Sequence, residues 1–595
     1  MNTLIDIISK ELKQAFTDCG YDEKYGQVTV SNRPDLCQYQ CNGAMAAAKE
    51  YKKAPIMIAN EVVEKVNKKL FSEVTAIAPG FINIKVCPYY LTLYLEDMQH
   101  AKKYGYEEQA KGQKVIVDYG GPNVAKPLHI GHLRSAVIGE SVKRLCRFAG
   151  NEVIGDVHLG DWGLQMGQII EELRDRQPDL CYFDENYTGE YPEEAPFTIS
   201  ELEEIYPAGS GKSKTDEVFK ERAQTATARL QEGYAPYIAL WKHILNVSVA
   251  DLKKNYSNLN VNFDLWLGES DAQVYIPAMI REMEEKGYAR ESMGALVVDI
   301  AEETDTKELP PCIVRKSDGA ALYETTDLAT IIQREKDYNP DRYIYVVDKR
   351  QELHFIQVFR AAKKCGLLPT EKDLFFLGFG TVNGKDGKPF KTREGGVMRL
   401  ENLIAGVNEE VFKKVMSGRE MAEEEAKEIS KLIGIAALKY ADLSNQASKD
   451  YIFDIDRFTS FEGNTGPYIL YTMVRIKSIL AKYAETVGQA DGVIAHPFGG
   501  ENESREYGAA EIDLMLTAAK FNDVIAHAYQ EMAPHKICQY IYEMANAFNG
   551  FYHANKIMSE DDKHKQGEWI ALITLVLHLL ETCIDILGFE APERM

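Results

Sequence analysis

Two histidines three residues apart, His129 and His132, stand in the segment GPNVAKPLHIGHLRS that covers residues 121–135. An apolar stretch precedes this segment and a stretch of helical period follows it, so it forms a strand-to-helix turn. Amides and the dipole at a helix start bind phosphate, and imidazole N–H groups donate to phosphate oxygens without a metal. We therefore expect a nucleotide phosphate at His129, Gly131 and His132, beside Lys126.

Other sites of this kind fit less well. The segment lacks the GxGxxG of dinucleotide-binding turns and the GxxxxGK[ST] of P-loops. A zinc site needs further ligands, and His158 and Cys146 repeat no known ligand spacing, so we predict no bound metal. Ordinary polarity at a helix start remains the simpler alternative.

A second segment, GKDGKPFKTREGG at 384–396, combines four glycines with cations at Lys385, Lys388, Lys391 and Arg393. A solvated surface turn is the simple interpretation. However, the segment follows an apolar strand, and the carboxyl ends of strands in an open α/β sheet face the ligand crevice. Two phosphate-binding loops suit adenylyl transfer from ATP, because one positions the triphosphate and the other neutralises charge on pyrophosphate.

Strands and helices that alternate must position these loops. We expect strands at 114–119, 152–157, 342–347 and 374–381, with further strand chemistry at 295–299 and 313–315. They predict a Rossmann-like parallel sheet interrupted by an insertion at about 165–300. The fold class is multidomain α/β: an α+β domain at 1–106, the sheet domain at 107–401 and an all-α domain at 402–595.

Composition limits the remaining choices. The 595 residues carry a net charge of −23, which opposes attachment to nucleic acid by bulk charge. Ten scattered cysteines without a CxxC pair indicate reduced thiols in a cytoplasmic protein. The most apolar window, 569–580, is too short to span a bilayer, so we expect no membrane association.

The two charged segments resemble known signatures. His129–His132 is similar to the HIGH signature of class I aminoacyl-tRNA synthetases, and Lys388–Thr392 to a degenerate KMSKS loop. The surrounding text resembles the arginyl-tRNA synthetase family over essentially the whole chain. The matching stretches are PGFINIKV (79–86), VDYGGPNVAKPLHIGHLRSAVIGE (117–140), HLGDWGLQMGQ (158–168), DGAALYETTDLA (318–329), YVVDKRQELHF (345–355), GKPFKTREG (387–395), FEGNTGPYILY (461–471), AFNGFYHAN (547–555) and APERM (591–595).

The resemblance implies a set of site residues. Arginine-binding positions are Asp118, Asn123, Tyr323, Asp327 and Gln351, and Tyr323 and Asp327 share a helix face because they are four apart. Lys126, His129, His132, Lys388 and Lys391 are the implied catalytic set. Asp348 and His354 face ATP or have a structural role. In the stretch 158–168, Asp161 belongs to the site or caps a helix, and Trp162 belongs to the site or is a core aromatic. Departures from the family pattern are Pro389, Phe390, Thr392 and Gly120-Gly121.

A tRNA partner requires a local basic surface despite the acidic total. Arg134, Lys143, Arg144 and Arg147 border the first signature, and the C-terminal part resembles an anticodon-binding domain. There the implied tRNA contacts are Arg475, Lys477 and Met595. Aromatic residues in the same region are helix core or stack on unpaired bases, namely Tyr468, Tyr471, Phe548, Phe551 and Tyr552.

Together these features predict an arginine–tRNA ligase that uses ATP with Mg²⁺ and has no tightly bound metal or organic cofactor. The resemblance implies a monomer whose arginine activation requires tRNA. Three rival functions remain: a synthetase for another amino acid, which the acidic pocket disfavours, a small-molecule adenylyltransferase, which leaves the helical domain unexplained, and a non-catalytic tRNA-binding paralogue, which the retained histidines and lysines disfavour.

Overall fold

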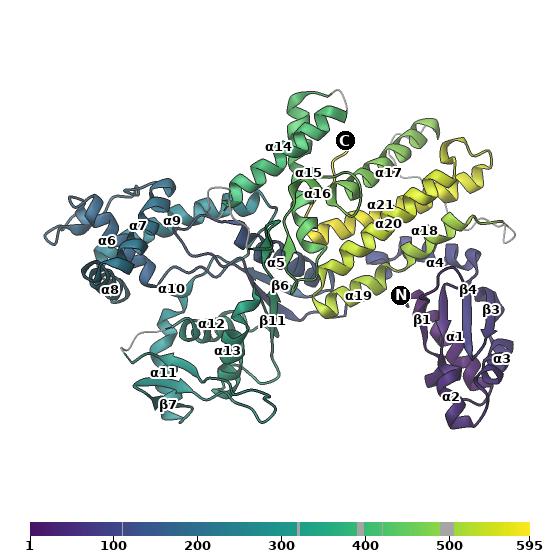
Figure 1. Cartoon of the computed structure of the whole chain (residues 1–595), viewed down its shortest axis with the longest axis horizontal. Helices are drawn as coiled ribbons and strands as arrows, with labels where there is room; N and C mark the ends of the chain where they lie inside the picture. The colour runs from purple at the N-terminus through teal and green to yellow at the C-terminus, as the bar shows by residue number, and fades with distance from the viewer. Residues whose placement is uncertain (110, 318–321, 389–397, 419–420, 488–504) are drawn as a thin grey trace.

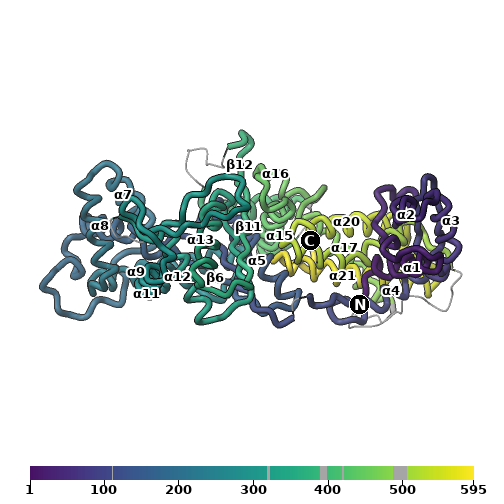
Figure 2. Tube along the Cα trace, turned by 90° about the horizontal axis from the view of Figure 1, so that it is seen from below, coloured from purple at the N-terminus to yellow at the C-terminus, as the bar shows by residue number. Residues whose placement is uncertain are grey.

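The computed structural model describes residues 1–109, 111–317, 322–388, 398–418, 421–487 and 505–595. The molecule is elongated (Figures 1 and 2). Helices α6–α9 form one end, the parallel sheet lies in the middle, and the N-terminal domain packs beside the C-terminal helices at the other end. The phosphate-binding segment therefore lies in the central part.

The central sheet has the strand order β11–β10–β5–β6, and all three pairings are parallel, as predicted. Its strands are β5 (Lys114–Tyr119), β6 (Glu152–Asp156), β10 (Arg342–Asp348) and β11 (Asp373–Phe379). Helix α5 (Ile130–Phe148) connects β5 to β6, and α13 (Glu352–Lys364) connects β10 to β11. The order reverses between β5 and β10, so the crevice at their carboxyl ends is the place where such sheets bind ligands.

The insertion is mainly helical. It contains α6 (Leu164–Arg176), α7 (Ile199–Thr215), α8 (Glu217–Gln231), α9 (Ala235–Ser257), α10 (Glu269–Ala272) and α11 (Ile276–Glu285). After α9 the segment 264–269 runs along β6: Leu265 donates to Gly155 O at 3.0 Å, and Leu159 donates to Leu267 O at 2.7 Å. This pairing carries Glu269 to the carboxyl edge of the sheet.

The strands predicted at 295–299 and 313–315 do not belong to the parallel sheet, which corrects the sequence interpretation. Strands β7 (Ala289–Ser292), β8 (Ala295–Val298) and β9 (Cys312–Arg315) form a separate antiparallel sheet. Met293 and Gly294 between β7 and β8 both have positive φ, the backbone of a tight hairpin turn. A two-residue connection can join only antiparallel strands.

The N-terminal domain is α+β, as predicted. Its antiparallel sheet has the order β1–β2–β4–β3, with β1 (Val28–Val30), β2 (Tyr39–Cys41), β3 (Phe71–Ile77) and β4 (Phe81–Val86). Helices α1 (Leu4–Asp18), α2 (Gly43–Tyr51), α3 (Pro55–Lys65) and α4 (Pro88–His100) complete it. Asn522 of the C-terminal part donates to Tyr104 O at 3.0 Å, which joins the two domains.

The C-terminal part is helical. It contains α14 (Leu400–Gly418), α15 (Glu423–Leu443), α16 (Ile455–Phe458), α17 (Gly466–Val487), α18 (Ala509–Ala519), α19 (Phe521–Glu531), α20 (Pro534–Ala554) and α21 (Lys563–Leu587). Among the described residues, α21 alone is long and apolar enough to cross a membrane, although the sequence window suggested a shorter segment. However, 72% of its most apolar window is buried inside the protein, so it is a core helix here.

Helix α12 (Tyr323–Asp337) follows the insertion and returns the chain to the sheet. After β11, the short strands β12 (Val382–Asn383) and β13 (Tyr451–Ile452) pair in parallel. This pair links the segment before Lys388 to the segment after α15.

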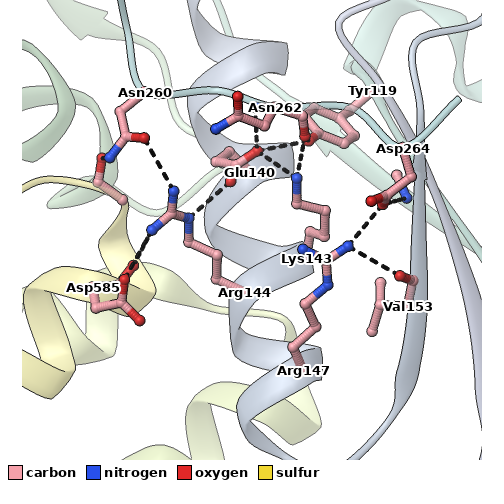
Figure 3. Close-up of polar contacts among 12 residues, drawn as sticks. Tyr119, Glu140, Lys143, Arg144, Arg147, Val153, Asn260, Asn262, Asp264 and Asp585 are labelled. Carbon is pink, nitrogen blue, oxygen red and sulfur yellow. Dashed lines mark hydrogen bonds and ion pairs between the residues drawn. The ribbon is translucent and has the colours of Figure 1, made fainter. Parts of the chain in front are cut away.

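A charged junction fixes α5 to the rest of the molecule (Figure 3). Glu140 accepts from Tyr119 Oη at 2.7 Å and Arg144 Nε at 2.8 Å, and Arg144 also donates to Asp585 of α21 at 3.0 Å. Lys143 pairs with Glu140 at 2.8 Å and is 1% exposed. Arg134 is equally buried and pairs with Asp442 of α15 at 3.1 Å. Arg134 and Lys143 therefore do not form the basic surface that the sequence suggested.

Candidate active site

The two histidines of the first signature cap α5 with their own rings. His129 Nδ1 accepts from the amide of Gly131 at 3.0 Å, and His132 Nδ1 accepts from the amide of His129 at 3.1 Å. An amide nitrogen is always a donor, so each Nδ1 carries no hydrogen and each neutral ring is protonated at Nε2. The ring centres are 4.0 Å apart, which leaves two adjacent N–H donors at the helix start.

Burial keeps both rings neutral. It lowers the pKa of His132 to about 3, with smaller contributions from His129 and Lys126. Burial and then the Lys126 ammonium also lower the pKa of His129. These imidazoles are hydrogen-bond donors at neutral pH, rather than cations or proton donors.

The chain directly after the second signature segment pairs with the backbone of the first. Ile130 donates to Met398 O at 3.1 Å, and Leu400 donates to Leu128 O at 2.8 Å. The other end of the second segment is held by an ion pair of 3.2 Å between Lys385 and Asp454. Lys388 is exposed, whereas Lys391 lies outside the described residues.

The predicted arginine set gathers at the crevice. Asp118 lies near the end of β5, Asn123 lies in the following turn, and Tyr323 and Asp327 are on the first two turns of α12. Gln351 is exposed directly before α13. Tyr323 is 63% exposed, so its ring is available to a ligand.

Asp118 already has a partner that the sequence did not reveal. Arg334, on α12 and 1% exposed, places one guanidinium nitrogen 2.6 Å from Asp118 and 2.7 Å from Asp156. Burial raises the pKa of Asp118, while Arg334 acts in the opposite direction. Arg334 thus compensates two buried carboxylates and fixes Asp118. Helical spacing from Asp327 places Arg334 near the same face, but a lone arginine gave no sequence signal.

His354 belongs to the same group. Its Nε2 lies 2.5 Å from Asp327 Oδ2, and its Nδ1 lies 3.5 Å from Glu324. Although burial opposes the charge, hydrogen bonds to Asp327 and Glu324 raise the pKa of His354 to about 9. Asp348 instead accepts from the amide of Arg350 at 2.9 Å and pairs with the Arg350 side chain. The structure therefore supports a local structural role for Asp348 and places His354 against Asp327.

Glu269 is a carboxylate near Asp327 that the sequence did not reveal. It is 8% exposed, and burial raises its pKa to about 7, with further influence from His158, Asp161 and Asp327. Both ring nitrogens of His158 are buried without a hydrogen-bond partner among the described residues, and Nε2 lies 4.0 Å from Asp327. Glu269 lies within a long insertion without a motif, so only the pairing of 264–269 with β6 reveals its place.

Two residues in the stretch 158–168, Asp161 and Trp162, make structural contacts. Asp161 accepts from the Ser270 amide at 3.0 Å and from the Ser270 hydroxyl at 2.6 Å, so it holds the start of α10. Trp162 packs against Trp241 with ring centres 5.2 Å apart. The structural alternatives for Asp161 and Trp162 therefore hold.

The basic residues predicted on the C-terminal helices differ in their partners. Arg475 donates to Asn549 Oδ1 and to the Tyr471 hydroxyl, each at 3.0 Å. Lys477 pairs with Glu593 at 2.7 Å and lies 3.8 Å from Glu581, while Met595 packs against the core. Tyr471 and Tyr552 are 41% and 38% exposed, whereas Phe548 and Phe551 are fully buried. Only part of the aromatic set is therefore accessible.

Family models match most of the chain. The model described as "tRNA synthetases class I (R), catalytic domain" matches residues 95–455. The DALR anticodon binding domain matches 469–595, and the arginyl tRNA synthetase N terminal domain matches 2–86. Together they follow the order of the three parts seen in the fold.

Curated proteins and solved structures agree with these matches. The chain is 60% identical to the arginine–tRNA ligase of Agathobacter rectalis and 58% identical to that of Alkaliphilus oremlandii, over 100% of both chains in each comparison. Its fold matches the arginyl-tRNA synthetases of Plasmodium falciparum (TM-score 0.79, 24% identity) and Thermus thermophilus (TM-score 0.76, 21% identity). Each of these structural matches covers 100% of both chains.

Proposed function

The chain belongs to the arginyl-tRNA synthetase family of class I, and from this premise we propose how its site works. The protein is an arginine–tRNA ligase. It joins L-arginine to ATP, giving arginyl-adenylate and pyrophosphate, and transfers arginine to the terminal adenosine of its tRNA. The paired Nε2–H donors of His129 and His132 at the start of α5 carry this assignment.

The first step is attack of the arginine carboxylate on the α-phosphate of ATP. No covalent bond to the enzyme is needed, so the side chains act by positioning and charge stabilisation. His129 and His132 donate to phosphate oxygens, and Lys126, Lys388 and Lys391 neutralise the departing pyrophosphate. Mg²⁺ enters with ATP and supplies further charge neutralisation, and no other metal or organic cofactor is required.

The arginine pocket is acidic, as a guanidinium requires. Tyr323 and Asp327 contact the substrate guanidinium, and Glu269 adds a second carboxylate from the insertion. Asn123, Gln351 and Asp118 orient the rest of the amino acid. Support for these roles comes from the place of Asp118 and Asn123 at the carboxyl end of β5 and of Gln351 after β10. Asp327 is close enough to Glu269 to affect its pKa.

The remaining proposals concern the whole enzyme. It is a cytoplasmic monomer without membrane association, and its arginine activation requires bound tRNA. The domain at 1–106 and the helical domain at 402–595, which lie beside each other at one end of the molecule, bind tRNA together with the catalytic domain at 107–401. Arg475, Lys477 and Met595 are proposed contacts.

Arginine-dependent exchange of labelled pyrophosphate into ATP tests the function. We expect exchange with arginine and a tRNA pool, and none with other amino acids or without tRNA. Exchange without tRNA would refute the tRNA requirement alone. Absence of exchange from folded protein that still binds tRNA would favour a non-catalytic tRNA-binding protein.

The variant His132→Ala tests the site. Loss of one preorganised donor lowers the exchange rate by about two to three powers of ten. An unchanged unfolding midpoint shows that the fold is intact. Full activity of folded His132→Ala would remove the phosphate role of His132.

A further inference from the structure

The helical insertion contacts the segment 123–130, which carries Lys126 and His129, through residues that the reaction scheme has not used. The Lys126 ammonium lies 5.0 Å from the centre of the Tyr206 ring, on α7. An ammonium over an aromatic face is attracted by the negative face of the ring. Lys126 also lies close enough to His129 and His132 to lower the pKa of both rings. Tyr206 therefore holds a cation that lies beside the two phosphate donors.

The backbone that leads to Lys126 is held by the same insertion. Ala125 has φ of +60°, which is unfavourable for a residue with a Cβ. Its amide donates at 2.9 Å to the hydroxyl of Ser248, which is 2% exposed on α9. This buried bond satisfies the amide in the strained conformation and fixes the direction in which Lys126 leaves the chain.

A third contact acts through Arg399. Its guanidinium lies 2.6 Å from Glu203 of α7, whose side chain is 9% exposed. Arg399 stands between Met398 and Leu400, which bond to the backbone at 130 and 128. Glu203 consequently fixes the segment that enters α5 and carries His129. A neighbouring pair, Lys254 and Glu401 at 3.4 Å, joins α9 to the same place.

Glu203 and Tyr206 are three residues apart, so they lie on one face of α7. Pro207 follows Tyr206 and has no N–H, so the helical bond that would reach the Glu203 carbonyl is absent. The first two turns of α7 are thereby less restrained by the rest of the helix. Lys126 and Arg399 contact these turns, which are also held by the Thr198–Glu201 capping box and by buried Leu202 and Ile205.

We propose that Tyr206 is a positioning residue for Lys126, and that Glu203 positions the His129 segment through Arg399. The insertion thus sets the geometry of the phosphate site. This inference rests on the proposed phosphate role of Lys126. It predicts that a change at Tyr206 affects ATP use only while Lys126 is present.

A double-mutant cycle of Tyr206→Leu and Lys126→Met tests the first contact. The full-length protein is assayed by pyrophosphate exchange with tRNA, and kcat/KM for ATP is measured at saturating arginine. We expect Tyr206→Leu to lower kcat/KM about fivefold in the parent protein, as loss of a cation–π contact does. In the Lys126→Met background it should have an effect of about twofold or less.

The conservative variant Tyr206→Phe is the matched control, because it keeps the ring face and should retain kcat/KM. Equal losses from Tyr206→Leu in both backgrounds, or no loss in either, would overturn the inference. The single variant Lys126→Met tests the proposed phosphate role separately. If it leaves the exchange rate unchanged, that role of Lys126 is wrong, and the inference that rests on it is wrong too. Unfolding midpoints of all variants separate these effects from misfolding.

The second contact is tested in the same assay with Glu203→Gln, Arg399→Gln and the double variant. Each single change should lower kcat/KM about two- to fivefold, because Arg399 is 53% exposed and its pairing is partly screened. The kcat/KM of the double variant should be no lower than that of the less active single variant. Multiplicative losses would show that Glu203 and Arg399 act independently.

Discussion

The position of one hydrogen on each signature histidine follows from the backbone amides at the start of α5. Both Nδ1 atoms accept from amides, so the hydrogens lie on the Nε2 atoms, where a phosphate oxygen can accept them. The ring at 132 thus has two separate duties, a helix cap on one nitrogen and a ligand contact on the other. A substitution can remove one duty and keep the other.

His132→Gln and His132→Asn separate these duties. The glutamine amide nitrogen reaches the position of Nε2, whereas an asparagine oxygen replaces only the accepting Nδ1. We expect His132→Gln to keep more pyrophosphate exchange than His132→Asn, by about tenfold. The measurement is exchange at saturating ATP, with unfolding midpoints as the control. A more active asparagine variant would show that capping, and not donation, is the main role of His132.

Glu269 predicts a pH dependence. Burial raises its pKa from an ordinary 4.5 to about 7, so it is neutral in acid and becomes charged through neutral pH. A cationic substrate binds the charged form better, and KM for arginine should fall about tenfold from pH 6 to pH 8. Glu269→Gln should remove this dependence, and an unchanged profile in that variant would assign the effect to another group.

The same carboxyl group affects stability in the opposite direction. Because its folded pKa is raised, its contribution is full below pH 4.5 and is lost as the pH rises through about 7. Over this interval the unfolded chain releases the proton first. As the pH rises from 4.5 to about 7, the urea midpoint of the parent protein should therefore fall more than that of Glu269→Gln.

At this scale the sequence predicted residues with a motif and missed those without one. The histidine pair and the Tyr323–Asp327 pair lie where their spacing indicated. Arg334, Glu269 and Tyr206 are single residues far from the signatures in sequence, and only tertiary packing brings them to the crevice. Buried pairing likewise removed Arg134 and Lys143 from the predicted basic face.

At the scale of elements, the approach of α5 to β5 depends on one glycine. A Cβ at Gly139 would lie 2.2 Å from Cγ of Tyr119, within the contact that packs the signature helix on the sheet. Tyr119 cannot move freely, because its hydroxyl is bound to Glu140 and Asn262. The helix must therefore shift if any side chain is added.

Gly139→Ala tests this contact. Overpacking should destabilise the protein by about 1–3 kcal/mol, seen as a lower urea midpoint. Gly211, in α7, has open space around the corresponding position, and Gly211→Ala should be neutral or stabilising by up to about 1 kcal/mol because alanine favours helix. Equal effects of the two substitutions would contradict the packing argument.

Elements of the central sheet could be predicted because their apolar runs and connecting helices are regular. The strands β8 and β9 were assigned to the wrong sheet, since a short apolar run does not specify its partner. The deciding feature was the turn at Met293–Gly294, where a methionine adopts a conformation more typical of asparagine or glycine. No residue pattern indicates that conformation for methionine.

At the scale of the molecule, a net charge of −23 must coexist with a tRNA surface. Arg475 is held by neutral partners, Asn549 and Tyr471, and keeps its full charge for a phosphate. The charge of Lys477 is already offset by Glu593 and Glu581. These neighbours on α17 therefore differ in what they can offer a nucleic acid.

Arg475→Ala should raise KM for tRNA about five- to tenfold in aminoacylation, and Lys477→Ala should raise it about twofold or less. The slope of the logarithm of tRNA affinity against the logarithm of salt concentration should become about one unit shallower in Arg475→Ala and stay unchanged in Lys477→Ala. Similar effects of both variants would show that the ion pairs of Lys477 open on binding.

The junction of Figure 3 has a consequence for synthesis of the protein. Arg144 and Asp585 are 441 residues apart in sequence, and a ribosome that adds about 5–20 residues per second needs at least about 20 seconds to cover that distance. During this time Arg144, which pairs with the buried Glu140, lacks the partner that α21 brings. Helix α5 therefore stays incompletely packed on each translating ribosome. We expect chaperones to bind the nascent chain until residue 585 has emerged.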